Sequence, residues 1–242
     1  LEGMTKNINK ALVSVAHKPA ISYIIEKFPE NIEIVIPVGY KAKSITDYIE
    51  IAYPKRKITF VEVDLYEGKG SGLGYSILKC EHHLQSPFIF SSNDTIVIEN
   101  IIPPDHNWMG QTDLKDNSQY RSVVSEKNRV SEIRAKNYKG NSKAYIGLSG
   151  IYNFEKFWDT MKNGLNQGAI EIGESFGLRS LINEGITTYN FTWFDTGNID
   201  NLNQTRDYFS KSNDYNILEK EEEAIWFQNE MVIKFSIDKN FI

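Results

Sequence analysis

The sequence predicts an α/β protein with a mainly parallel sheet that helices cover on both faces. Short runs rich in β-branched residues alternate with segments of helical spacing, as expected for consecutive β-α-β units. With 242 residues, the chain is long enough to bury such a sheet in one large domain, alone or with a small appendage.

The first half of the chain carries the clearest alternation. Residues 32–38 form a short run rich in β-branched residues that ends at Gly39 and predicts a buried strand, and residues 58–63 predict a second strand. Between them, residues 44–52 have helical spacing and begin with a serine that can cap a helix. A glycine run opens the helical segment 70–84, and the strand predicted at 87–92 leads directly into Asn93 and Asp94.

The second half is richer in strands. Its predicted strands are 120–126, 129–135, 143–154 and 186–193, its predicted helices are 154–165, 174–185 and 198–210, and a hairpin is predicted at 224–236, turning at Asn229.

The composition excludes several classes of protein. The 27 Lys and Arg against 32 Asp and Glu give a net charge of −5, which argues against a nucleic-acid scaffold. Cys80 has no partner for a disulfide, and the adjacent His82 and His83 would diverge by about 100° on a helix rather than meet at one metal. No apolar run approaches the ~18 residues that a membrane span needs, and a reducing, cytoplasmic location is the default expectation.

Four features are candidates for chemistry. Asp94 and Asp195 each follow a predicted strand, and ligands of open α/β sheets bind at the carboxyl ends of strands. Two such carboxylates suit Mg²⁺, although aspartates also cap helices and turns. The glycines at 68–74 can bring the backbone close to an anionic or flat ligand, or form a flexible turn. Lys10 is a further candidate that also fits an ordinary loop cation.

Taken together, these features resemble the nucleotidyltransferases that activate sugar phosphates and phospho-alcohols. The matching pieces are Lys10-Ala11-Leu12, Lys18-Pro19-Ala20-Ile21, Gly39-Tyr40, Gly70 to Gly74, Asn93-Asp94-Thr95 and Trp193-Phe194-Asp195-Thr196-Gly197. The resemblance covers residues 1–210. It implies a GT-A-like fold, three layers α/β/α with a mixed, mainly parallel central sheet. It also implies transfer of a nucleoside monophosphate from an NTP to a phosphorylated small molecule, which would supply an activated precursor for surface polysaccharide or a related pathway.

The resemblance also implies roles for individual residues. Asp94 and Asp195 would hold Mg²⁺, and Lys10 would neutralise the triphosphate. The nucleotide would lie against Gly70, Gly72, Gly74, Tyr40 and Asn93. On the acceptor side, Lys136 would meet the phosphate, and Glu171 or Glu174 would orient hydroxyl groups. CTP, UTP and dTTP are the favoured nucleotides, while the base, the acceptor and homo-oligomer formation stay open.

Both ends of the chain depart from the simplest form of this family. Relatives open with a central strand and a glycine-rich loop that ends in arginine, so we expect about 10–20 further residues ahead of Leu1. Residues 211–242 are expected to be a linker and a hairpin. This hairpin resembles the start of a choline-kinase-like domain, with Lys234 as its ATP lysine, and equally fits an edge hairpin or a dimer contact.

Two other functions fit the same residues. One is a GT-A glycosyltransferase that uses a nucleotide sugar through Asn93-Asp94-Thr95. The other is a regulatory domain that binds a nucleotide without turning it over.

Overall fold

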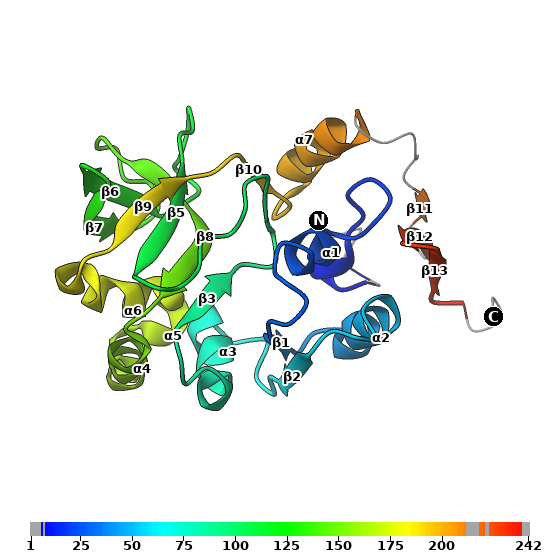
Figure 1. Cartoon of the computed structure of the whole chain (residues 1–242), viewed down its shortest axis with the longest axis horizontal. Coiled ribbons are helices and arrows are strands. Elements are labelled where there is room, and N and C mark those ends of the chain that lie inside the picture. The colour runs from blue at the N-terminus through cyan, green and yellow to red at the C-terminus, as the bar shows by residue number, and fades with distance from the viewer. Residues whose placement is uncertain (1–5, 7, 212–217, 221–222, 239–242) are drawn as a thin grey trace.

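The computed structural model describes residues 6, 8–211, 218–220 and 223–238, and Figure 1 shows the whole chain. The helices are α1 (Ala20–Ile25), α2 (Ala42–Ala52), α3 (Leu73–Lys79), α4 (Phe154–Asn163), α5 (Ala169–Ile172), α6 (Glu174–Ser180) and α7 (Ile199–Ser210), with 3₁₀ turns at Lys10–Leu12, Glu81–His83, Leu165–Gln167 and Ile182–Glu184. The strands are β1 (Ile34–Val38), β2 (Ile58–Glu62), β3 (Phe88–Ser91), β4 (Thr95–Val97), β5 (Trp108–Thr112), β6 (Ser122–Glu126), β7 (Arg129–Arg134), β8 (Lys143–Ile151), β9 (Thr187–Asn190), β10 (Trp193–Asp195), β11 (Leu218–Lys220), β12 (Glu223–Gln228) and β13 (Met231–Ser236).

The largest sheet has six strands in the order β3-β8-β5-β9-β7-β6. Within the described residues, the parallel pairs are β1–β2 and β5–β9, and the other pairs are antiparallel. The sheet is therefore mixed, as expected, but with fewer parallel pairs than the alternation suggested. The reason is that β6, β7 and β8 follow one another through short loops, whereas a parallel pair needs a crossover of about a dozen residues or more.

The β1-α2-β2 unit is the parallel element that the sequence predicted most directly. Ile34 faces Ile58 across the pair, and α2 supplies the crossover. Ser44 is not the helix cap, however. Helix α2 begins at Ala42 after Lys41 in a left-handed conformation, and the Ser44 hydroxyl donates to the Lys41 carbonyl from inside the first turn.

The two sheets of the N-terminal half are not joined by a ladder. Among the described strands, β1 pairs with β2 alone and β3 pairs with β8 alone. The central strand that the family resemblance implies ahead of Leu1 stays a prediction.

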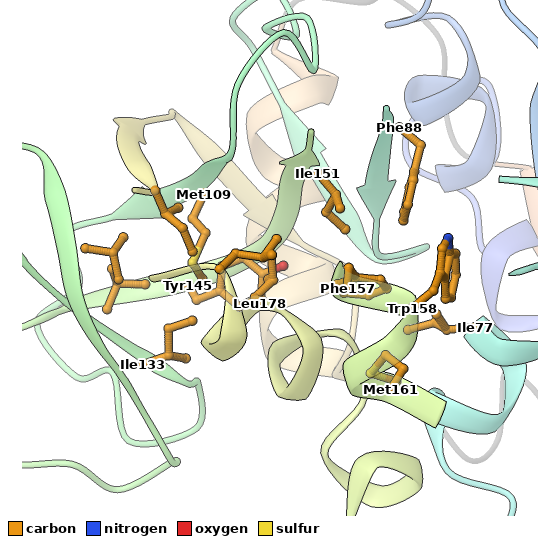
Figure 2. Packing of buried hydrophobic residues seen from close by; sticks show 14 of the residues in the cluster. Ile77, Phe88, Met109, Ile133, Tyr145, Ile151, Phe157, Trp158, Met161 and Leu178 are labelled. Atoms are coloured by element: carbon orange, nitrogen blue, oxygen red, sulfur yellow. The ribbon is translucent and has the colours of Figure 1, made fainter. Parts of the chain in front are cut away.

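A large core packs helices α3 to α6 against one face of the six-stranded sheet (Figure 1). Figure 2 shows Phe157 and Trp158 of α4 beside Phe88 of β3. The rings of Phe88 and Trp158 stack at 5.4 Å with an interplanar angle of 15°. Neighbouring residues of a strand face opposite sides of the sheet. Accordingly, Met109 of β5 joins this core, whereas Trp108 packs on the other face.

The strand predicted at 186–193 is split in two. Strand β9 belongs to the six-stranded sheet, whereas β10 forms a separate antiparallel pair with β4. The break falls at Phe191, which is buried, and at Thr192, whose backbone N–H and hydroxyl both donate to the Glu99 carboxylate. This turn moves the chain across to β4 and carries Asp195 with it.

The predicted C-terminal hairpin is present as β12 and β13, with Asn229 in a left-handed conformation at its turn. Trp226 of β12 belongs to the same hydrophobic cluster as Ile25 of α1 and Ile49 of α2. The linker expected after residue 210 lies largely outside the described residues. Among the residues that are described, no helix combines the length and apolar character that crossing a bilayer requires.

Candidate active site

Asp94 lies in the turn between β3 and β4 and forms an ion pair with Lys10. The Lys10 ammonium contacts Asp94 Oδ2 at 2.7 Å, and the Ser92 hydroxyl donates to Oδ1 at 2.6 Å. Burial alone would raise the pKa of Asp94, but the charge and hydrogen bond of Lys10, with the bond from Ser92, hold that pKa below its ordinary value. The Asp94 carboxylate is therefore ionised and is already paired with a cation.

Asp195 ends β10 and lies close to Asp94 because β4 and β10 are paired. Asp195 is the register partner of Thr95, and the Thr196 N–H donates to the Asp94 carbonyl at 3.0 Å. A Cβ at Gly197 would lie 2.8 Å from Asp195 Oδ1 and 3.1 Å from Asp94 Oδ2. The two carboxylates thus face each other across Gly197, where only glycine leaves the space between them open.

Tyr120 and Asn201 also belong to the site, although the sequence did not point to them. The Tyr120 hydroxyl donates to Asp195 Oδ2 at 2.8 Å, and the Asn201 amide donates to the same oxygen at 2.6 Å. Burial and then the Asp195 carboxylate raise the pKa of Tyr120, so the phenol remains a donor. Tyr120 is 75 residues away from Asp195 in the sequence, and no local pattern marks it.

The glycine run has a different role from the one expected. A Cβ at Gly72 would lie 2.3 Å from the Ile170 carbonyl oxygen, and one at Gly74 would lie 2.1 Å from that of Ala169. These glycines let α3 pack directly against the backbone of α5. Helix α5 fills the space where these Cβ atoms would lie, and contact of the segment's backbone with a nucleotide stays a prediction.

Gly72→Val is accordingly expected to lower the free energy of unfolding by about 2 kcal/mol or more, because the side chain meets backbone atoms that cannot rotate away. Urea denaturation measures the loss. Gly68→Ala is the matched control, since its Cβ would meet nothing within 4 Å and only its positive φ of 82° opposes the change. Gly72 has an ordinary φ of −65°, so a loss in Gly72→Val no larger than that in Gly68→Ala would show that close packing against α5 does not require glycine there.

Tyr40 lies just after β1 and is 41% exposed. Its ring is 6.4 Å from that of Tyr66 in an edge arrangement, and its carbonyl accepts from the Asn9 side chain at 2.7 Å. Asn9 directly precedes Lys10 and caps its 3₁₀ turn. Tyr40 is thus tied to the segment that carries Lys10, on the outside of the fold where a flat ligand can reach it.

The remaining predicted residues are not joined to the aspartate pair by any contact within the described part of the chain. Asn93 is exposed in the turn beside Asp94, and Lys136 is exposed in the turn after β7 rather than in the strand. Glu171 is exposed on α5 next to Gly72. Glu174 is buried, and its Oε2 has no hydrogen-bond partner among the described residues. Exposure therefore favours Glu171 over Glu174 for meeting an acceptor.

Because Glu174 is buried, we expect the free energy of unfolding to depend on pH. Burial raises the pKa of Glu174 to about 7, although Arg121 and Tyr145 oppose the rise. The folded chain then keeps a proton that the unfolded chain has released above its ordinary pKa of 4.5. Stability should therefore fall by roughly 3 kcal/mol as the pH rises from about 4.5 to above 7.

Glu174→Gln is expected to remove this part of the pH dependence, so that the variant loses less stability than the wild type between pH 5 and pH 8. Urea denaturation at the two pH values measures the difference, with Glu171→Gln on the exposed neighbour as control. Parallel pH profiles for the wild type and Glu174→Gln would show that Glu174 has an ordinary pKa.

Comparison with known proteins gives relatives for most of the chain. It is 27% identical to the bifunctional protein GlmU of Methanococcus vannielii over 228 residues, 86% of this chain and 52% of that protein. It is 26% identical to the protein of the same name from Methanocaldococcus jannaschii, over 97% of this chain and 57% of that protein. The chain thus spans about half the length of these curated relatives, and no protein-family model matches it.

Solved structures share the fold. CTP:phosphocholine cytidylyltransferase from Streptococcus pneumoniae superposes with a TM-score of 0.69 at 20% identity, over 86% of this chain and 93% of that one. A putative glucose-1-phosphate thymidylyltransferase from Bacillus anthracis gives 0.71 at 19% identity, over 91% and 93%. The chain thus shares the fold of these nucleotidyltransferases and resembles the GlmU proteins in sequence. The family resemblance and the GT-A-like fold expected from the sequence are thereby confirmed.

Proposed function

We propose that this chain is a nucleotidyltransferase that transfers a nucleoside monophosphate from an NTP to a phosphorylated small molecule. The observation that carries the proposal is the grouping of Lys10, Asp94 and Asp195, which the sequence separates widely and the fold brings to one place. In the reaction, a phosphate oxygen of the acceptor forms a bond to the α-phosphorus of the NTP. The bond from that phosphorus to the bridging oxygen breaks, and pyrophosphate leaves with the electron pair.

Such a transfer depends on positioning and on neutralising charge rather than on a protein nucleophile. Lys10 is the cation of the group, and we assign it to the triphosphate. Its present partner Asp94 keeps the ammonium at the site, 2.7 Å from Oδ2, before any nucleotide arrives. The family chemistry thus needs only an exchange of partners at Lys10, from a carboxylate to a phosphate.

The two aspartates fit a Mg²⁺ ion. Their oxygens face each other across Gly197. The Lys10 ammonium beside Asp94 shows that this position already stabilises a positive charge. Among the described residues, no three His, Cys, Asp or Glu side chains form a metal-binding group, so a bound ion would complete its shell with phosphate oxygens and water. When bound, Mg²⁺ would neutralise charge that develops on the phosphates.

Residues on the two sides of this centre are proposed to bind the two substrates, the nucleotide and the acceptor. Tyr40 and the Gly70–Gly74 segment are proposed for the base, with CTP, UTP or dTTP favoured, and Glu171 and Lys136 for the acceptor. By their names, these two structural neighbours act on phosphocholine and glucose 1-phosphate, which supports a phospho-alcohol or a sugar phosphate as the acceptor class. A precursor for surface polysaccharide, a cytoplasmic location and homo-oligomer formation remain predictions.

The proposal is tested by pyrophosphate release. Each of CTP, UTP, dTTP, GTP and ATP is paired with choline phosphate, glucose 1-phosphate, N-acetylglucosamine 1-phosphate and inositol 1-phosphate, with Mg²⁺ present. Pyrophosphate release that requires both substrates supports the proposal. Nucleotide binding without release for any pair would favour a regulatory domain, and release of nucleoside diphosphate from a nucleotide sugar would favour a glycosyltransferase.

A further inference from the structure

We propose that Tyr120 and Asn201 are positioning residues that make Asp195 a cation ligand through Oδ1 alone. This inference rests on the proposed function, because it assigns the geometry of a carboxylate that the function uses. Neither residue carries a role in the reaction assigned above.

The hydrogen bonds of Asp195 distinguish its two oxygens. Oδ2 accepts from the Tyr120 hydroxyl at 2.8 Å and from the Asn201 amide at 2.6 Å, whereas Oδ1 accepts from the Gly197 N–H at 2.6 Å. A carboxylate offers about four lone-pair positions, two on each oxygen. Oδ2 is therefore fully used, and Oδ1 keeps one position.

The free position is on the oxygen that points at the partner carboxylate. A Cβ built on Gly197 would lie 2.8 Å from Asp195 Oδ1 and 3.1 Å from Asp94 Oδ2, the oxygen that contacts the Lys10 ammonium, so Oδ1 is the Asp195 oxygen on the side of Asp94. Tyr120 and Asn201 lie on the opposite oxygen. The donors thus fix the rotation of the carboxylate so that its remaining capacity faces the place where the cation binds.

The two donors are themselves held by separate elements. Asn201 lies in the first turn of α7, where its N–H donates to the cap residue Asn198 at 2.9 Å, and its amide also donates to the Tyr120 hydroxyl at 2.7 Å. The Tyr120 ring packs edge-on against Trp193 with centroids 4.9 Å apart. The ring therefore stays in place when the hydroxyl is removed, which makes Tyr120→Phe a specific test.

The experiment measures Mn²⁺ affinity by electron paramagnetic resonance of the free ion, without nucleotide or turnover. Tyr120→Phe is expected to weaken Mn²⁺ binding about 10-fold, as substitution of a residue that orients a metal ligand typically does. The thermal midpoint should stay within about 2 °C of the wild type. Tyr208→Phe on α7, whose side chain is exposed, is the matched control and should leave the affinity unchanged.

A double variant separates positioning from structure. If Tyr120 acts through Asp195, Tyr120→Phe should cause no further loss of Mn²⁺ affinity in the Asp195→Asn background, whereas a general structural effect would add to it. Unchanged affinity in Tyr120→Phe, or an additive loss in the double variant, overturns the inference and leaves the proposed function standing. Unchanged affinity in Asp195→Asn overturns the inference together with the metal assignment, while pyrophosphate release by the wild type still decides the reaction.

Discussion

Asp94→Asn and Asp195→Asn are each expected to lower the rate of pyrophosphate release by ~10²-fold or more, because each removes a carboxylate that would hold Mg²⁺ beside the transferring phosphate. The two variants should differ in stability. Both oxygens of Asp195 accept hydrogen bonds from N–H or O–H donors, so an amide NH₂ there must face a donor in either orientation. Asp195→Asn should therefore also lose about 1–3 kcal/mol of stability.

Rates must be compared per folded molecule, so the thermal midpoint of each variant is measured beside its pyrophosphate release. Asp200→Asn is the matched control, because Asp200 is exposed in the first turn of α7. The substitution makes the same change in net charge and should keep the wild-type rate. A variant at Asp94 or Asp195 that keeps near wild-type release shows that its carboxylate is not part of the reacting centre.

The sequence predicted the elements that carry a local signal. The strands predicted at 32–38, 58–63 and 87–92 agree with β1, β2 and β3 to within one or two residues at each end, and the acid that follows β3 is a site candidate from the sequence alone. Asp94 could be found because a polar residue directly after a buried strand is a local pattern. The ion pair with Lys10 joins residues 84 positions apart and became visible only with the fold.

Other features have no local signal. The run 186–193 is rich in β-branched and aromatic residues throughout, and only the Glu99 carboxylate, 93 residues away in the sequence, shows why it breaks at Thr192. Tyr120 begins the strand predicted at 120–126, and nothing in that pattern points to Asp195. The glycines before α3 are compatible with a ligand cradle, a turn or a close helix contact, because all three require a missing Cβ, and the carbonyls of Ala169 and Ile170 decide among them.

The C-terminal hairpin bears on where the folding unit ends. Trp226 is 1% exposed, packs edge-on against Tyr48 of α2 at 5.1 Å and donates from Nε1 to the Ser14 hydroxyl at 2.9 Å. The N–H of Phe227 donates to the His17 carbonyl at 2.8 Å. The hairpin thus binds the loop that follows Lys10, and the division into residues 1–210 and 211–242 stays a prediction that this contact makes testable.

Trp226→Ala is expected to lower the free energy of unfolding by about 3–5 kcal/mol, because a fully buried indole leaves a large cavity between α1, α2 and the hairpin. The loss should appear in the main urea transition, monitored by far-UV circular dichroism, since the cavity lies in a core shared with the N-terminal elements. Val232→Ala on the exposed side of β13, 56% exposed, is the control and should change stability by less than about 0.5 kcal/mol. A main transition that stays at the wild-type midpoint in Trp226→Ala would show that the hairpin folds independently, as the start of a separate kinase-like domain would.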